Sequence, residues 1–504
     1  MSLQVLASIT AEMARELALA EQVCIRPILR RVLDRDTGID QTVPIPCGST
    51  REAVCPPCAH KARVLRMQQC AEGWHRTDEP MSAGGASTGL GNETDDDHGA
   101  DDHGTRDADR RVRSTRRRDD TADLPRVPVE DRTIGRVFVA PDGREYRPSM
   151  FLTLTLPSYG PVRDGAPIRP GSYDYRRAAL DALHFPKLVD RFWQNLRRCA
   201  GYKVQYFATI EPQRRLAPHL HAAIRGAIPR GLLRQVIAAS YVQVWWPAHD
   251  EPVYVRRLPV WDGYNYVDPD TGVILPTWDQ AVDQLTANPD AKPAHVMRFG
   301  TQTDMRGIIA PSPDADRAVR YLTKYLTKAI GDTHGTEATA NDLVRHGDRL
   351  HAELRWLPCA PTCANWLRFG IQPDHPGPGL VPGRCPAKTH DRDHLGLGGR
   401  RVLVSRQWSG KTLAGHRADR ATVVREALLT AGILAPEIER LAADVTAADG
   451  LPRYVWTDAK PDPITYTRVL LASIAERHRW RAQYQAAKTA NQAVDSLSAT
   501  DQPP

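Results

Sequence analysis

Apolar and polar residues alternate in the middle of the chain, as they do in half-buried strands. The segment 151–156, FLTLTL, alternates large apolar residues with threonine and is followed by a Pro-Ser turn. Further strands are predicted at 204–210 and 219–224, which a polar turn joins, and near 295–309. The short connections favour an antiparallel sheet.

Helical spacing of apolar residues predicts helices that alternate with these strands. They are expected at 185–199, at 231–244, after Pro311, and at 464–488. Sheet, helix and sheet again indicate an α+β fold, with an antiparallel sheet and flanking helices in a central domain. The C-terminal part is expected to be helical.

The N-terminal 22 residues could be mistaken for a signal peptide. They lack a basic start, and Glu12 and Glu16 interrupt the apolar run, so an amphipathic helix fits better. No run in the chain approaches the roughly 18 apolar residues of a membrane span. We therefore expect a cytoplasmic protein with no membrane partner, whose nine cysteines are metal ligands or core residues rather than disulfides.

The composition changes along the chain and divides it into predicted domains. The 67 Lys and Arg against 60 Asp and Glu give a net charge of only +7, a weak pointer to nucleic acid. Residues 78 to about 135 carry few apolar side chains, so this stretch is predicted to be disordered. Its basic segment RRVRSTRRR either contacts phosphate groups of a nucleic acid or is only solvated. We predict a zinc-binding module (1–77), a charged disordered linker (78–145), the α+β domain (146–332), a second Cys/His module with a basic loop (333–415) and a helical region (416–504).

Three polar groups in the central domain suggest chemistry. His219 and His221 flank Leu220, so on a strand both imidazoles point to one face and offer two corners of a metal site. Glu211 ends the preceding strand and reaches the same face if the two strands pair. Two nitrogens and one oxygen suit Mg²⁺ or Mn²⁺. The alternatives are ordinary core or surface histidines and a solvated glutamate.

The segment RAVRYLTKYLTKAI places two phenols and two amines together. Tyr321, Lys324, Tyr325 and Lys328 share one face of a predicted helix. Such a face suits a phosphate backbone, because lysines neutralise its charge while a phenol oxygen attacks. The alternative is an amphipathic helix whose tyrosines pack and whose lysines extend to solvent.

Eight cysteine and histidine residues form two candidate zinc sites. The first holds Cys24, Cys47, Cys55 and Cys58, with His60 or Cys70 as substitutes; the second holds Cys359, Cys363, Cys385 and His390, with His375 as a substitute. Four protein ligands in each leave no open position, so both zinc ions would be structural. A redox-active CxxC is disfavoured because no thioredoxin-like pattern surrounds it. Cys199 is expected in the core.

A basic stretch lies between the second cysteine group and the C-terminal region. It carries Arg400, Arg401, Arg406, Trp408 and Lys411. These residues could contact a DNA backbone or stack on a base. A strand with solvated arginines is the alternative.

Together these segments resemble the HUH endonuclease superfamily. FLTLTL is similar to the first motif of rolling-circle initiators, HLH to the His-hydrophobe-His motif and YLTKYLTK to the tyrosine motif. CIRPI, PCGSTREAVCPPCA and GGRRVLVSRQWSGKTL resemble actinobacterial replication initiators of plasmids and integrative elements. The resemblance covers nearly all of the chain except the linker, which is longer than the family leads us to expect.

The resemblance implies an activity and a set of roles. A divalent ion held by His219, His221 and Glu211 polarises the scissile phosphate, and a tyrosine attacks to leave a 5′-phosphotyrosine and a free 3′-hydroxyl primer. Both tyrosines match the motif, and Tyr325 is favoured slightly over Tyr321 for the first nick. The implied partners are origin DNA, single-stranded at the nick, and host replication proteins. A relaxase or transposase, or a zinc-stabilised DNA-binding regulator without catalysis, is the alternative.

Overall fold

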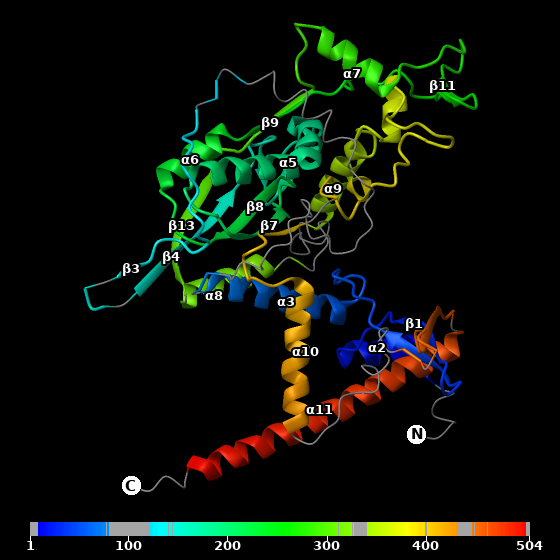
Figure 1. The fold of residues 1–504 in the computed structure, drawn as a ribbon. Helices are drawn as coiled ribbons and strands as arrows, with labels where there is room; N and C mark the ends of the chain where they lie inside the picture. The colour runs from blue at the N-terminus through cyan, green and yellow to red at the C-terminus, as the bar shows by residue number, and fades with distance from the viewer. Residues whose placement is uncertain are drawn as a thin grey trace. The chain divides into compact units, whose positions relative to one another are not determined.

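The computed structural model describes most of the chain outside the linker. The described residues are 9–76, 78–79, 118, 120–121, 123–139, 141–143, 145–310, 312–324, 326, 340–398, 401–430, 446–447, 449–460 and 462–499. They form two compact units (Figure 1). The terminal unit comprises Met1–Cys70, Leu326–Lys328 and Lys411–Pro504, and the central unit comprises Ala71–Tyr325 and Ala329–Gly410.

An antiparallel sheet organises the central unit. Its strand order is β13 (Thr303–Ala310), β4 (Glu145–Leu154), β8 (Pro218–Ile224), β7 (Tyr206–Pro212) and β14 (Val402–Val404). The short strand β3 (Phe138–Val139) pairs with the start of β4. Both β7 and β8 are buried along their whole length. The α+β class and the antiparallel sheet agree with the sequence prediction.

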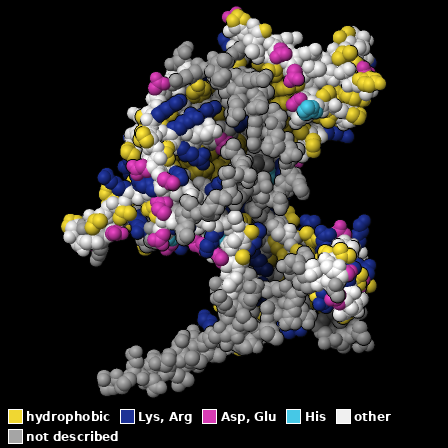
Figure 2. All heavy atoms as spheres, viewed as in Figure 1, with side chains coloured by type: hydrophobic (Ala, Val, Ile, Leu, Met, Phe, Trp, Pro, Cys, Tyr) yellow, Lys and Arg dark blue, Asp and Glu magenta, His cyan; other side chains and the backbone are white. Residues whose placement is uncertain are grey.

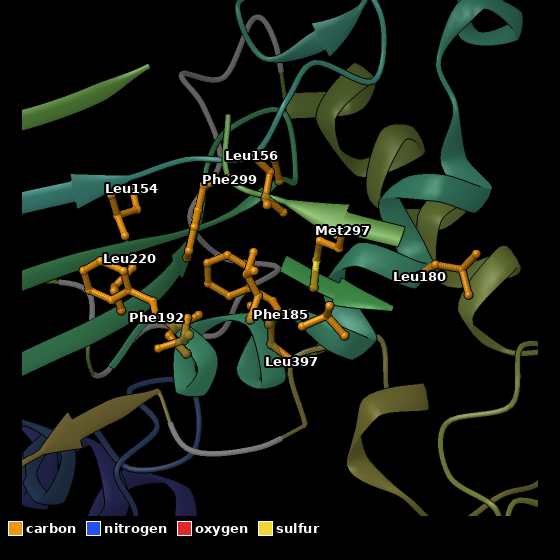
Figure 3. Close-up of a cluster of buried hydrophobic side chains, with 14 of the residues drawn as sticks. Leu154, Leu156, Leu180, Phe185, Phe192, Leu220, Met297, Phe299 and Leu397 are labelled. Atoms are coloured by element: carbon orange, nitrogen blue, oxygen red, sulfur yellow. The ribbon is translucent and has the colours of Figure 1, made fainter. Parts of the chain in front are cut away.

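Helix α5 (Tyr175–Cys199) packs against one face of this sheet and makes the main core. Asp174 caps its first turn by accepting a hydrogen bond from the backbone N–H of Arg177, and apolar residues then recur along its inner face. Figure 3 shows Leu154 of β4 and Leu220 of β8 directed toward the aromatic rings of α5. Alternation along the strands therefore sends the neighbouring residues to the opposite face.

Helix α8 (Pro313–Thr323) packs on that opposite face, against β13, β7 and β8. Ser312 caps it by accepting from the backbone N–H of Ala315, and proline occupies its first position, where no N–H is needed. Leu322 and Val319 face inward and are buried. The sheet thus lies between α5 and a helix that carries Tyr321.

The other elements of the central unit surround this core. They are β5 (Val162–Arg163), β6 (Ala166–Pro167), η1 (Pro170–Ser172), α6 (Arg230–Ala239), β9 (Tyr241–Val244), β10 (Val260–Trp261), β11 (Tyr266–Val267), α7 (Trp278–Ala287), β12 (His295–Arg298), α9 (Ala340–Leu354), η4 (Ala364–Phe369) and η5 (Lys388–His390). Figure 2 shows apolar side chains at the surface of the part that contains β11, where Tyr264 is 85% exposed.

The terminal unit joins both ends of the chain. It contains α2 (Ala11–Ala20), β1 (Ile28–Asp34), β2 (Asp40–Ile45), most of α3 (Pro56–Trp74), α10 (Leu413–Thr430), β15 (Tyr454–Asp458) and α11 (Pro463–Ala499). The three strands form one antiparallel sheet in the order β15-β1-β2. Leu470 of α11 packs against Ala14 and Ala18 of α2, so the amphipathic N-terminal helix is present and packs on α11.

Several predicted elements differ from the observed ones. The helix expected at 231–244 ends at Ala239, because Tyr241–Val244 pairs with β12 as a strand. The strand expected near 295–309 is two strands, β12 and β13, and the region expected to be helical from 416 onward includes β15. None of the described helices is long and apolar enough to cross a membrane.

The prediction of disorder for 78–145 is wrong for residues from about 130 onward. Residues 138–139 pair with β4, and Glu130 bridges to Tyr202. The Glu79 carboxylate accepts hydrogen bonds from the backbone N–H groups of Thr133 and Ile134. Backbone pairing orders these residues despite their polar composition. Residues 81–117 lie outside the described part of the chain.

Candidate active site

The two histidines lie on β8, with a paired strand on each side. His221 faces Thr153 of β4 and Thr209 of β7, and His219 faces Glu211 of β7. Directly opposed residues of antiparallel strands point to the same side of the sheet. Strand register therefore brings together the three predicted ligands, and Leu220 between the histidines enters the core.

The ligand atoms of Glu211, His219 and His221 all lie within 4.8 Å of one another. The two Nε2 atoms converge to 2.7 Å, and the hydroxyl of Thr153 lies 2.9 Å from Nδ1 of His221. A hydrogen bond at Nδ1 orients the ring and leaves Nε2 for an ion, as in many metal sites. Two imidazoles and one carboxylate fit a divalent ion that keeps open positions.

Burial sets the protonation of these groups. It lowers the pKa of His219 to about 4, and it lowers that of His221 to about 3 with a further contribution from the neighbouring imidazole. Both rings are therefore neutral near pH 7, the form that binds metal. Burial raises the pKa of Glu211 to about 7, against the opposing charge of Arg401. A divalent ion would favour its ionised form.

Tyr321 reaches the same cluster from α8. Its phenol oxygen lies 3.3 Å from Nε2 of His221, and the two rings meet edge to face with centroids 4.9 Å apart. Phe151 packs against both rings. Tyr321 stays 44% exposed, so the phenol is both held near the histidines and open to a ligand. Lys324, the cap residue of α8, is exposed and acts electrostatically on Glu211.

Only part of the predicted tyrosine face can be placed. The described helix ends at Thr323, with Lys324 as its cap. Tyr325 and Lys328 lie outside the described residues. The face that the structure shows is therefore Tyr321 with Lys324.

Comparison with known proteins gives a match along nearly the whole chain. The family model RepSA, described as "Replication initiator protein, pSAM2", matches residues 10–477. The chain belongs to this family. A replication initiator protein from Streptomyces ambofaciens is 30% identical over 266 residues, which cover 44% of this chain and 52% of that protein. The chain thus spans about half the length of this relative, and no solved structure matches it.

In this RepSA-family chain the first cysteine group lies in the terminal unit. Cys24, Cys47, Cys55 and Cys58 bring their sulfurs within 4.8 Å of one another. Cys55 and Cys24 are 3.8 Å apart, close to the edge of a tetrahedron with Zn–S bonds of about 2.3 Å. The group fits zinc. The suggested substitutes, His60 and Cys70, are not part of it.

The second group lies in the central unit. Cys359, Cys363, Cys385 and His390 likewise converge within 4.8 Å. Cys359 and Cys385 are 3.9 Å apart, and Nδ1 of His390 lies 2.7 Å from the carbonyl oxygen of Leu354, which leaves Nε2 for a metal. His375 is outside the group. Cys199 is buried in the main core, as predicted.

The basic stretch of the RepSA-family chain is exposed only in part. Trp408 is completely buried against Trp74 and Phe207, so the idea that it stacks on a base is wrong. Arg406 and Lys411 are exposed, and Lys411 pairs with Asp419. Arg400 lies outside the described residues.

The sequence did not predict the positions of three residues of the site. Arg401, expected on a DNA-binding surface, is half-buried; its Nε lies 3.4 Å from the carbonyl oxygen of Ile210, and its charge lowers the pKa of Glu211. Thr153 and Phe151 were used only to predict a strand. Phe151 and Thr153 are two residues apart in FLTLTL, so both lie on the histidine face. The alternation in the sequence could therefore have predicted that they belong to the site.

Proposed function

We propose that this chain is a rolling-circle replication initiator of the HUH endonuclease type. It would nick one strand at an origin through a tyrosine, leave a 5′-phosphotyrosine and a free 3′-hydroxyl primer, and later rejoin the strand. The single observation that carries the proposal is the 3.3 Å distance between the phenol oxygen of Tyr321 and Nε2 of His221, beside His219 and Glu211. Family membership supports the replication role.

His219, His221 and Glu211 would hold Mg²⁺ or Mn²⁺. When bound, this ion supplies a Lewis acid that stabilises the charge developing on the scissile phosphate. The protein's part is orientation: Thr153 holds the ring of His221, and the buried strands keep the three side chains converged. A site held by sheet register needs little reorganisation during the reaction.

The phenol of Tyr321 is the nucleophile that the described geometry supports. Its oxygen forms a bond to phosphorus as the bond from phosphorus to the 3′-oxygen breaks, the phenolic proton leaves, and the 3′-oxygen gains a proton. Lys324 would neutralise a neighbouring phosphate. The roles of Tyr325 and Lys328 remain predictions, including the preference for Tyr325 in the first nick.

Two structural zinc ions would accompany this activity. The Cys24 and Cys359 groups each supply four ligands, which leaves no position for water. The proposed partner is origin DNA, single-stranded at the nick, together with host replication proteins. Among the residues of the basic stretch, Arg406 and Lys411 are exposed and suit backbone contact, whereas Arg401 would act beside Glu211.

A covalent adduct tests the proposal. The protein is incubated with Mn²⁺ and single-stranded DNA that spans the origin of its replicon, and the products are resolved on a denaturing gel. We expect an adduct that EDTA suppresses and that the double variant Tyr321→Phe/Tyr325→Phe abolishes, with peptide mapping to assign the tyrosine. Tyr264→Phe, at an exposed tyrosine between β10 and β11, is the matched control and should keep the adduct. A wild-type protein that binds DNA but forms no adduct would be a regulator, and the proposal would fail.

A further inference from the structure

Helix α11 of the terminal unit carries one continuous face whose chemistry changes along its length. Tyr466, Leu470 and Ile474 recur at steps of four residues and pack in the small core with α2. The same face then continues, at steps of three and four residues, with a basic and aromatic set: Arg477, Arg481, Tyr484 and Lys488. The face is therefore apolar where it packs on α2 and basic farther along.

The basic half of this face is open. Glu21, which caps the C-terminal end of α2, pairs with His478 and Arg481 at 3.3 Å each. From Arg481 to Thr489 every residue whose side chain the structure describes is exposed, including Tyr484 at 46%. Helix α10 also contacts α11 but leaves these residues exposed, and Figure 1 shows α11 continuing past α2 toward the C-terminus. A partner can therefore reach this part of the face.

The positive charge of this helix is poorly compensated in the described part of the terminal unit. Residues 463–488 hold five lysines and arginines and one acidic residue, Glu476. Neither Arg479 nor Lys488 has an ion pair among the described residues. Burial, with repulsion from Arg481, lowers the pKa of Arg477. Neighbouring cations that repel one another are stabilised by a negative partner.

The three-stranded sheet of the same unit shows the opposite pattern. Four arginines in or next to its strands each pair with an aspartate: Arg30 with Asp458, Arg31 with Asp40, Arg35 with Asp449 and Arg453 with Asp34. The unit neutralises the charge of its sheet internally and leaves positive charge on α11. This concentration of charge on one helix indicates a polyanionic partner.

We propose that residues 477–488 of α11 lie in the major groove of duplex DNA. An α-helix with its side chains is about 10–12 Å wide, which fits a groove about 12 Å wide. The basic set spans about 16 Å along the helix axis, so Arg481 and Lys488 can contact separate phosphates with Tyr484 between them. The inference goes beyond the proposed function, because duplex binding needs neither a metal ion nor attack by a tyrosine. The two share only the origin DNA as a partner.

Binding of a short mixed-sequence DNA duplex to the whole chain, measured by fluorescence anisotropy over a range of salt concentrations, tests the proposal. Arg481→Gln/Lys488→Gln should weaken binding about 100-fold, or about tenfold for each charged contact. It should reduce the slope of log K against log salt by about 1.8, because each phosphate contact contributes about 0.9. Arg481→Lys/Lys488→Arg keeps both charges and should keep the slope.

Arg468→Gln/Arg479→Gln is the matched control. Both arginines are exposed residues of α11, so this variant loses the same two charges from the same helix. They lie about 140–160° around the helix from Arg481, on the side away from the proposed contact. The control should keep the wild-type slope. Thermal melts identify any loss of binding that follows from unfolding. If loss of the pair with Glu21 unfolds the double variant, Lys488→Gln alone should still reduce the slope by about 0.9.

Three results would overturn the inference. One is wild-type affinity and slope in Arg481→Gln/Lys488→Gln, and another is an equal loss in the control, which would assign the effect to overall charge. The third is a loss of binding to single-stranded DNA or to vesicles of anionic phospholipid with duplex binding unchanged, which would assign the face to that partner. The proposed function is tested separately, because Arg481→Gln/Lys488→Gln should form the covalent adduct on short single-stranded DNA at the wild-type rate. A wild type without an adduct leaves the duplex measurement interpretable.

Discussion

The central unit holds two candidate metal sites that are built in opposite ways. Glu211, His219 and His221 lie on two buried strands, so the backbone ladder sets their separation before any ion binds. Cys359, Cys363, Cys385 and His390 lie on loops and short 3₁₀ turns between Leu354 and Val402. The fold makes the first site, whereas the second site helps to make the fold.

The loop-held site is not supported by metal alone. Trp366 is completely buried and packs against Trp246 and Trp278. The side chain of Asn365, also buried, donates to the carbonyl oxygen of Leu357 and accepts from the backbone N–H of Gly383. It therefore links two loop segments through their backbone groups. These contacts fix the loops around Asn365 and Trp366, and a metal ion would hold the remaining loop segments together. Loss of a ligand should therefore have different consequences in the two sites.

The largest effect is expected at the strand-held site, and it should appear in activity. His221→Ala removes one ligand and the contact to Tyr321, so we expect adduct formation to fall about a thousandfold, a loss of several kcal/mol of transition-state stabilisation. The free energy of unfolding should change by less than about 2 kcal/mol, because the strand ladder remains. Rates of adduct formation and a urea titration measure the two quantities. An unfolded His221→Ala protein would show that the site is as necessary to the fold as the loop-held one.

Cys363→Ser should show the reverse pattern, with an effect that appears in stability rather than in activity. It removes one of four zinc ligands on a segment with little regular structure, and we expect a loss of about 4 kcal/mol in the free energy of unfolding. Zinc content should fall from two ions per chain to one. Adduct formation should fall only as far as the folded fraction falls.

Cys199→Ala is the matched control for that prediction. Cys199 is a buried thiol of the same unit, but it packs in the apolar core and belongs to neither cysteine group. Its loss should cost about 1 kcal/mol as a small cavity and leave the zinc content unchanged. Equal losses in Cys363→Ser and Cys199→Ala, with zinc unchanged in both, would contradict the zinc assignment.

The same contrast explains how much of the fold could be predicted from the sequence. Alternation in FLTLTL predicted a strand at 151–156, and the observed β4 shares only residues 151–154 with it and begins at Glu145. The spacing of His219 and His221 predicted β8 closely, because residues two apart in a strand share a face. The predicted end of α6 was wrong because the pattern of 231–244 does not show that Tyr241–Val244 pairs with β12, more than fifty residues later. Pairing with a distant strand overrides local propensity.

The residues of the candidate active site were likewise predictable only where they lie close together in the sequence. Glu211, His219 and His221 could be grouped from spacing alone, since two adjacent strands carry them. Arg401 could not be placed beside Glu211, because β14 joins β7 across almost two hundred residues. Trp408 was expected at the surface for the same reason: the burial that Trp74 and Phe207 provide comes from distant parts of the chain.

Thr153→Ala should give the smallest of these effects and separates orientation from ligation at the strand-held site. Among the described residues, the hydroxyl of Thr153 lies 2.9 Å from Nδ1 of His221 and is hydrogen-bonded to neither Glu211 nor Tyr321. Its loss frees the imidazole to rotate without removing a ligand, so we expect Mn²⁺ affinity to fall about 10-fold to 100-fold. At saturating Mn²⁺ the rate of adduct formation should recover most of the wild-type value, whereas that of His221→Ala should not. Thr153→Ser keeps the hydroxyl and should bind Mn²⁺ nearly as well as the wild type. If alanine and serine at this position behave alike, strand register alone holds His221, and the comparison between the two sites becomes sharper still.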